Sequence, residues 1–252
     1  NGSGRAPSGL SSEWLLAQGI SKIERKTPHS VTVPGAVDAW VQMNRDHGTM
    51  DLGQLLAPAI AYAEEGYPVT QRVSTDFAAS VDALDDDART VFTRDGGPIP
   101  LGARHSQPLL AATLRRIAKD GRTGFYEGPV ADDILGKLQQ LGGTHTQDDF
   151  DAAIGDYVMP ITSAFRDHNI WECPPNGQGV IALMLLNIMS GIDTFGDHPI
   201  SADRMHYEIE AGRLAYRDRG AVLSDPAFSD VPVAEMLSAA SVSYTHLTLP
   251  TI

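Results

Sequence analysis

The sequence contains a single cysteine, Cys173, among its 252 residues. One cysteine excludes an intrachain disulfide framework and any zinc cluster built on paired cysteines. A cysteine nucleophile needs a neighbouring base and a helix N-terminus, and the flanking Trp-Glu-Cys-Pro-Pro shows neither. We therefore expect Cys173 to be a buried structural thiol.

Long apolar runs and basic residues are also scarce. The longest apolar stretch, Gly179 to Met189, falls short of the roughly 18 residues that span a membrane, so it predicts a buried helix.

Lysine and arginine number 19 against 32 acidic residues, which gives a net charge of −13. Such a surface repels phosphate backbones and anionic lipids, and we expect neither nucleic acid nor a membrane as a partner. Acidic runs such as 85–87 are expected to be solvated helix ends or loops.

The rest of the composition is that of an ordinary folded protein. Hydrophobic residues make up 42% and charged residues 20% of the chain. The length suits one large domain or two small ones.

The spacing of apolar residues predicts that helices dominate the chain. Asp51, Thr146 and Ser201 stand where a side chain caps a helix N-terminus, and Thr146 with Asp149 forms the pattern of a capping box. Helices are expected over 36–47, 52–65, 108–119, 129–141, after 146, over 179–189 and after 201. The apolar face of the second should consist of Leu52, Leu55, Leu56, Ala59, Ile60 and Ala63, and that of the last should include Met205, Ile209, Gly212 and Tyr216.

The pattern changes to an alternation between residues 157 and 175. It predicts two strands joined by a turn at 167–169. Helices, then a hairpin, then helices again are typical of an α+β or layered α/β protein.

Histidines lie near acidic residues in two places, but neither has the spacing of a zinc site. We interpret both groups as surface caps and turns. They are His145 with Asp148 and Asp149, and His168 with Asp167, Glu172 and Cys173.

Two short glycine-rich segments, 2–4 and Asn176-Gly177-Gln178-Gly179, lack the full phosphate-binding pattern. The second precedes a predicted helix, so its N–H groups could face an anion or a developing oxyanion. The alternative, which we favour, is a tight turn that requires positive φ. The adjacent acidic pairs 64–65 and 132–133 point in different directions on their helices and are expected to be solvated.

Five longer segments carry a family resemblance. They are VTVPGAVDAWVQMNRDHGTMDLGQLLAPAIAYAEEGYPV, FYEGPVADDIL, LGGTHTQDDF, AFRDHNIWECPPNGQGVIALMLLNI and AYRDRGAVLSDPAF. In this order they resemble the large subunit of the γ-glutamyltranspeptidase family.

The resemblance implies an α+β fold that is a fragment of the four-layer αββα fold of N-terminal-nucleophile hydrolases. Family members cut their own precursor, and the new N-terminal threonine attacks a γ-glutamyl amide with its own α-amine as the base. It implies a small-molecule γ-glutamyl or acyl-amide substrate, and the protein's own small subunit as partner after self-cleavage. It implies no metal and no organic cofactor.

The resemblance assigns residues 1–240 to a large-subunit segment whose own N-terminus is missing. Residues 241–252 differ from the family, and Tyr244 stands where the family has its nucleophilic threonine. We interpret this tail as foreign to the fold, either translated adaptor sequence or a disordered extension. The chain alone is therefore expected to have no catalytic residue and no activity.

In the family, an arginine two residues before a Met-Ala-Pro-like turn holds the α-carboxylate of the substrate. Counting back from Ala6-Pro7 places Ser3 there, with Arg5 displaced by two positions. We expect Arg5 and Ser3 to lie at the substrate site, in a register that resembles the acylase-like branch. The alternative is a noncatalytic α+β protein that binds a small molecule on the same scaffold.

Overall fold

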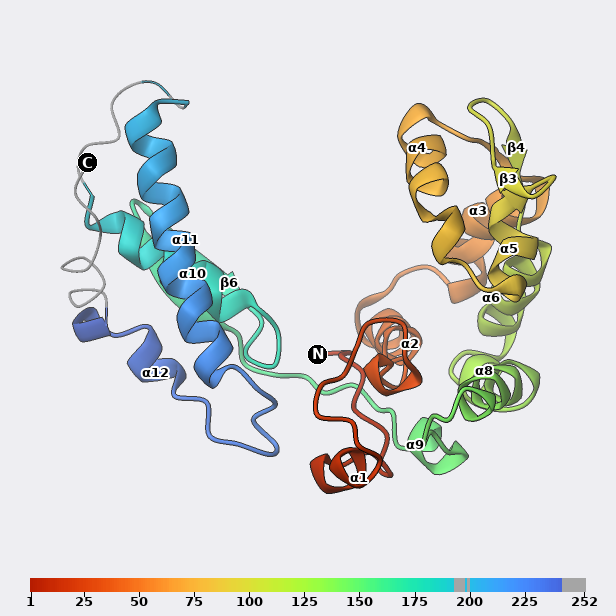
Figure 1. Ribbon diagram of the computed structural model, residues 1–252, viewed down its shortest axis with the longest axis horizontal. Helices are drawn as coiled ribbons and strands as arrows, with labels where there is room; N and C mark the ends of the chain where they lie inside the picture. The colour runs from red at the N-terminus through yellow and green to blue at the C-terminus, as the bar shows by residue number, and fades with distance from the viewer. Residues whose placement is uncertain (193–197, 199, 242–252) are drawn as a thin grey trace. The chain divides into compact units, whose positions relative to one another are not determined.

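The structure is a computed structural model that describes residues 1–192, 198 and 200–241 (Figure 1). It consists of two compact units: the N-terminal unit, Gly2–Asp156, and the C-terminal unit, which holds Asn1 and the residues from Tyr157 onward. The sequence did not predict this boundary. The predicted boundary at residue 240 stays a prediction, because residues 242–252 of the tail lie outside the described residues.

The N-terminal unit is mainly helical. Its α-helices are α1 (Ser12–Ala17), α2 (Ala36–His47), α3 (Leu52–Glu65), α4 (Gln71–Ser80), α5 (Asp86–Phe92), α6 (Pro108–Asp120), α7 (Thr123–Tyr126), α8 (Pro129–Gln140) and α9 (Gln147–Asp151), with short 3-10 helices η1 (Pro28–Ser30) and η2 (Val81–Ala83). Antiparallel pairs join β1 (Tyr67–Pro68) to β4 (Arg104–His105) and β2 (Thr93–Arg94) to β3 (Gly97–Pro98).

Local signals set the helix ends of this unit as predicted. The Asp51 side chain accepts a hydrogen bond from the N–H of Gln54 and caps α3. Thr146 and Asp149 form the predicted capping box at α9. The acidic run at 85–87 is also a helix end, since Asp85 caps α5 through the N–H of Ala88.

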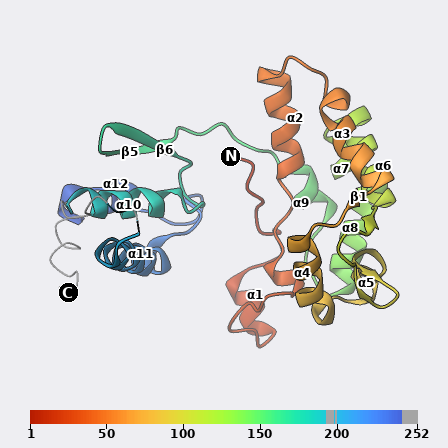
Figure 2. The same cartoon turned by 90° about the horizontal axis from the view of Figure 1, so that it is seen from above.

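Helices α3 and α6 run side by side and form the centre of the core (Figures 1 and 2). Ala63 of α3 and Ala111 of α6 are buried there, and their small side chains allow the two helices to approach closely. The predicted face of α3 is right for Leu52, Leu56 and Ile60, which pack against this core, but wrong for Leu55 and Ala59, which are exposed.

The C-terminal unit contains a hairpin of β5 (Ile161–Phe165) and β6 (His168–Glu172), followed by α10 (Gly179–Ser190), α11 (Ala202–Val222) and α12 (Val233–Met236). The hairpin is confirmed, but its turn is shifted. Phe165 pairs with His168, which leaves Arg166 and Asp167 as the turn in place of the predicted 167–169. Arg166 adopts a φ of 53°, which tightens the connection to two residues.

Helix α10 lies between the hairpin and α11 (Figure 2). Its side chains are buried on both sides, as its apolar composition predicts; they include Val180, Ile181, Leu183, Met184, Ile188 and Met189. None of the described helices is long and apolar enough to cross a membrane.

The prediction for the face of α11 is right only for Gly212, where an added Cβ would contact Leu185 of α10. The cap of α11 at Ser201 is confirmed, but Met205, Ile209 and Tyr216 are exposed. The buried side chains are Ala211 and Ala215, which pack with residues of α10 in two clusters. Small side chains at the contact let the helices approach closely, so packing distance rather than hydrophobicity selects the inner face.

The prediction for Cys173 is also wrong, because its side chain is exposed. The residue directly follows β6, at the point where the chain leaves the hairpin for the Pro-Pro segment.

Candidate functional site

The N-terminal segment 2–5 lies against the chain that leads into α2. The N–H of Val33 donates to the carbonyl of Arg5 at 2.9 Å. A Cβ on Gly4 would collide with the Val33 carbonyl, and a Cβ on Gly2 would lie 2.5 Å from the Cβ of Ala39. These glycines are therefore required by close backbone packing, and the segment they fix is the one that carries Ser3 and Arg5.

Ser3 and Arg5 line one side of a small hollow in the N-terminal unit. The other side is formed by Gly35 and by the chain that follows α9, residues 153–155. Both residues predicted for the substrate site are thus brought to the same hollow.

Arg5 is held at the rim of this hollow by Asp156. Its Nη2 donates to Oδ2 of Asp156 at 3.2 Å. The side chains are 60% and 67% exposed, so solvent screens the pair and it contributes little to stability. A guanidinium has five N–H donors, so it can bind a second carboxylate beside Asp156.

A buried carboxylate lies beneath the rim. Asp38, in the first turn of α2, is 3% exposed. Its Oδ1 accepts from Nε of Arg122 at 3.0 Å, and its Oδ2 accepts from the N–H of Gly155 at 2.7 Å and from Nε2 of Gln42 at 2.6 Å. Asp38 was not identified from the sequence, although an acid on the inward side of a helix, beside Val37, is a recognisable signal.

Arg122 connects this carboxylate to the end of α9. Its Nη2 donates to the carbonyls of Phe150, Asp151 and Ala153 at 3.0, 2.9 and 3.3 Å. Its guanidinium also lies 4.5 Å from the ring centre of Tyr126. The charge of Asp38 is thereby neutralised, and the chain from α9 to the hollow is fixed.

Tyr126 joins this network to the start of α2. Its hydroxyl donates to the carbonyl of Pro34 at 2.7 Å and accepts from the N–H of Asp38 at 3.3 Å. Burial raises the pKa of Tyr126, which keeps the phenol protonated and able to donate.

Asp149 anchors the N-terminal segment from below. Its Oδ1 accepts from the N–H of Ser8 at 2.8 Å, and its Oδ2 accepts from the N–H and hydroxyl of Thr146 at 2.9 Å. Burial acts to raise the pKa of Asp149, but the hydrogen bonds from Ser8 and Thr146 outweigh it and the pKa is lowered. The carboxylate is therefore ionised at neutral pH and holds Ser8 against α9.

The other predicted segment, Asn176-Gly177-Gln178-Gly179, belongs to the C-terminal unit and leads into α10. Neither glycine has a φ in the left-handed region, so the expectation of a positive-φ turn is wrong. A Cβ on Gly179 would lie 2.7 Å from the Cβ of Glu172, so this glycine permits close packing against β6. Whether the segment faces a substrate stays a prediction.

The histidines predicted on the surface differ in their burial. His168 is exposed at the hairpin turn, as expected. His145 is 1% exposed, and its Nε2 lies 2.9 Å from the carbonyl of Val31, so it is a core residue and the surface prediction is wrong. Among the described residues, no group of three or more His, Cys, Asp and Glu side chains is arranged to hold a metal ion.

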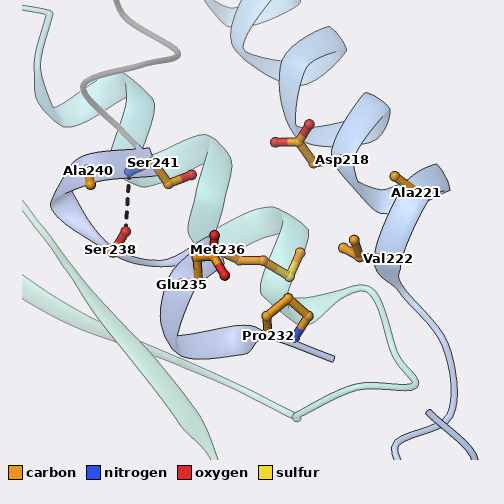
Figure 3. Close-up of a pocket in the computed structure, with 9 residues that line it drawn as sticks. All are labelled: Asp218, Ala221, Val222, Pro232, Glu235, Met236, Ser238, Ala240 and Ser241. Carbon is orange, nitrogen blue, oxygen red and sulfur yellow. Dashed lines mark hydrogen bonds between the residues drawn. The ribbon is translucent and has the colours of Figure 1, made fainter. Parts of the chain in front are cut away.

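A larger cavity of about 570 Å³ lies in the C-terminal unit between α11 and the region of α12 (Figure 3). Val222, Pro232 and Met236 form an apolar side, and the carboxylates of Asp218 and Glu235 project from the two elements. Asp218 already pairs with Arg217 at 2.9 Å.

The comparisons with known proteins agree with one another. A family model described as Gamma-glutamyltranspeptidase matches residues 1–248. The chain is 36% identical to the glutathione hydrolase-like YwrD proenzyme of Bacillus subtilis (strain 168), over 94% of this chain and 45% of the relative. It is 34% identical to the acylase ACY 1 proenzyme of Pseudomonas sp. (strain V22), over 84% of this chain and 38% of the relative. The chain thus spans less than half the length of these relatives.

Solved structures show that the fold of this chain is also similar to that of known proteins. The cephalosporin acylase from Bacillus halodurans matches with a TM-score of 0.90 at 35% identity, over 99% of this chain and 48% of the other. The γ-glutamyltranspeptidase of Helicobacter pylori matches with a TM-score of 0.89 at 27% identity, over 99% of this chain and 74% of the other. The predicted fold class, an α+β piece of the N-terminal-nucleophile hydrolase fold, is confirmed.

Proposed function

The chain belongs to the γ-glutamyltranspeptidase family, and we propose that it is a large-subunit segment of a self-processing enzyme that cleaves γ-glutamyl or related acyl amides. The observation that supports this is the match along almost the whole chain to relatives named as proenzymes, both hydrolases and acylases. The noncatalytic alternative is not favoured, because these relatives are enzymes.

The relatives extend beyond the part that this chain matches. In this proposal the nucleophile belongs to a segment that corresponds to that additional part. That nucleophile is a threonine made N-terminal by self-cleavage, and its α-amine takes the hydroxyl proton as the oxygen attacks the amide carbonyl. The small subunit that carries it is the partner of this chain.

The contribution of the present chain is to bind and orient the acyl part of the substrate. Arg5 lies at the rim of a hollow, more than half exposed, and offers donors beyond the one used by Asp156. A carboxylate on the acyl part of the substrate is the chemistry that fits this arginine, and charge-assisted pairing fixes its orientation. Ser3 lines the same hollow.

The position of Arg5 favours the acylase-like branch. Asp156 occupies part of the guanidinium, so a substrate carboxylate approaches from the remaining side. A flexible dicarboxylic acyl chain satisfies this geometry without an α-amino group. The substrate class we propose is therefore an amide of a dicarboxylic acid, which includes γ-glutamyl and glutaryl amides.

The test uses the complete protein and, as a control, this chain alone. Each is incubated and followed by denaturing gel and mass spectrometry, then assayed with the γ-glutamyl, glutaryl and butyryl p-nitroanilides. We expect the complete protein to cut itself and to prefer the two substrates that carry a carboxylate, whereas the chain alone does neither. A complete protein that stays uncut and releases no nitroaniline would support the noncatalytic alternative.

A further inference from the structure

The buried Asp38 carboxylate is more than a helix-start residue. An acid at this position can act through the macrodipole while exposed, so the helix itself gives no reason for burial. Asp38 is nevertheless 3% exposed, and its two oxygens accept three hydrogen bonds, two of them from segments distant in the sequence and one from Gln42 of the same helix.

One of these bonds holds the backbone of the hollow. The N–H of Gly155 donates to Oδ2 of Asp38 at 2.7 Å, across 117 positions of sequence. The carbonyl of the same glycine accepts from Nε2 of Gln42 at 3.0 Å, and that nitrogen also donates to Asp38. Two side chains one turn apart on α2 therefore hold both polar groups of Gly155.

The next residue along the chain is Asp156, the partner of Arg5. Clamping Gly155 fixes the position from which the Asp156 side chain extends. Arg122 fixes the preceding segment through the carbonyls at the end of α9, while pairing with Asp38. A continuous set of contacts thus runs from the interior of the unit to the guanidinium at the rim.

We propose that Asp38 is a positioning residue for Arg5: through Gly155 and Asp156 it sets the orientation in which the guanidinium meets the substrate carboxylate. This rests on the proposed function in that Arg5 is taken to bind that carboxylate. The competing view is that Asp38 only stabilises the core, and the two views differ in what they predict for substrate selectivity.

A double-mutant cycle in the complete protein tests the proposal. The variants are Asp38→Asn, Arg5→Ala and the pair together, each assayed with glutaryl and butyryl p-nitroanilides. The asparagine keeps the size of the side chain, but its NH2 must replace one of the two oxygens. It then faces either the donor of Arg122 or the donors of Gln42 and Gly155, and in both cases the charge that pairs with Arg122 is lost, so the clamp is disrupted. We expect Asp38→Asn to raise KM for the glutaryl substrate about tenfold, with kcat and the butyryl substrate little changed. In the Arg5→Ala background it should add less than about twofold, because residues acting through one another are not additive.

Two further variants separate positioning from folding. Gln42→Ala removes the clamp on the Gly155 carbonyl while leaving the Asp38–Arg122 pair, and should raise the glutaryl KM in the same direction by a smaller factor. Ala131→Gly, at a fully buried position in α8, lowers stability without removing a hydrogen bond of the network or a residue that lines the hollow, and should leave both KM values unchanged. Equal rises on both substrates, or full additivity with Arg5→Ala, would overturn the proposal.

Hydrogen exchange on the present chain distinguishes failure of the proposal from failure of the proposed function. Asp38→Asn should speed exchange in segments 2–6 and 153–156 more than in α6, whereas Ala131→Gly should not. If Arg5→Ala leaves KM unchanged on every substrate, the proposed role of Arg5 fails, and exchange alone decides whether Asp38 positions it. Unchanged exchange in both segments of Asp38→Asn would refute the positioning role.

Discussion

Replacing Arg122 with leucine should destabilise the N-terminal unit more than any exposed arginine would. The substitution leaves the Asp38 carboxylate buried without its charged partner, although Gly155 and Gln42 still donate to it. It also removes the side-chain donor to the carbonyls of residues 150, 151 and 153 and the cation–π contact with Tyr126.

The magnitude follows from the burial of the pair. Removing one partner of a buried ion pair costs about 3–5 kcal/mol, because the remaining charge is uncompensated. The Arg122 side chain is 24% exposed and that of Asp38 is 4% exposed, so water reaches the arginine end and the lower part of this range applies. We therefore expect a loss of about 3 kcal/mol in the free energy of unfolding.

Urea unfolding followed by tryptophan fluorescence measures this loss. In a Trp171→Phe background the signal comes from Trp14 and Trp40, which both belong to the N-terminal unit. At a slope of about 2 kcal/mol per molar urea, the midpoint should fall by roughly 1.5 M.

Two variants control for general effects. Arg115→Leu removes an arginine whose ion pair with Glu64 is about half exposed on both sides, and should cost less than about 1 kcal/mol. Arg122→Met combined with Asp38→Leu removes both charges together and should lose less than the sum of the single changes. A loss below about 1 kcal/mol for Arg122→Leu would mean that the Asp38 charge is not dependent on Arg122, and the reasoning would be wrong.

Four other outcomes are expected. Arg5→Ala in the complete protein should lower kcat/KM for carboxylate-bearing amides about ten- to hundredfold through KM, with partial rescue by lysine; an unchanged KM contradicts it. Gly4→Ala should cost about 1–3 kcal/mol because its Cβ meets the Val33 carbonyl, whereas Gly136→Ala, in open space on α8, should stabilise slightly; denaturant midpoints compare the two. Burial, and to a smaller extent the charge of Arg94, lowers the pKa of His105. The contribution of His105 to the free energy of unfolding should therefore be constant above about pH 6.5 and should fall below it by up to about 1.4 kcal/mol per pH unit, until the pH reaches the lowered pKa. His105→Phe should abolish this slope in unfolding curves taken from about pH 5 to 8. Deleting residues 241–252 should change the unfolding free energy by no more than about 0.5 kcal/mol, and a larger loss by calorimetry would show that the tail packs.

Local chemistry allowed much of the fold to be predicted. The helix starts at Asp51, Thr146 and Ser201 are confirmed because each is decided by a side chain and the N–H groups two or three residues later. The hairpin was predicted from alternation alone. Its turn was placed wrongly because alternation fixes which residues face together but not the number left between the strands.

The errors concern contacts between distant segments. The exposed face of α11 has the larger apolar residues, so a sequence pattern that ranks side chains by hydrophobicity selects Met205 and Ile209 over Ala211 and Ala215. The structure selects the alanines because α10 must approach closely, and that distance is set by a partner the local pattern does not include. The burial of His145 was missed because it also depends on a distant segment: its partner is the carbonyl of Val31, 114 positions away.

In the candidate site, too, the residues with a local signal were predicted and those defined by distant contacts were not. Arg5 and Ser3 were predicted from the resemblance of a short segment, but the residues that orient them are found only through contacts across more than 100 positions, such as that between Asp38 and Gly155. An aspartate beside Val37 in an amphipathic helix is normally read as a helix-start residue that faces solvent. What distinguishes Asp38 is that one of its three hydrogen bonds comes from the N–H of Gly155, next to the residue that pairs with Arg5. A buried carboxylate that binds the backbone of this rim is better explained by geometry at the rim than by core stability, since an apolar side chain of similar volume would stabilise the core as well.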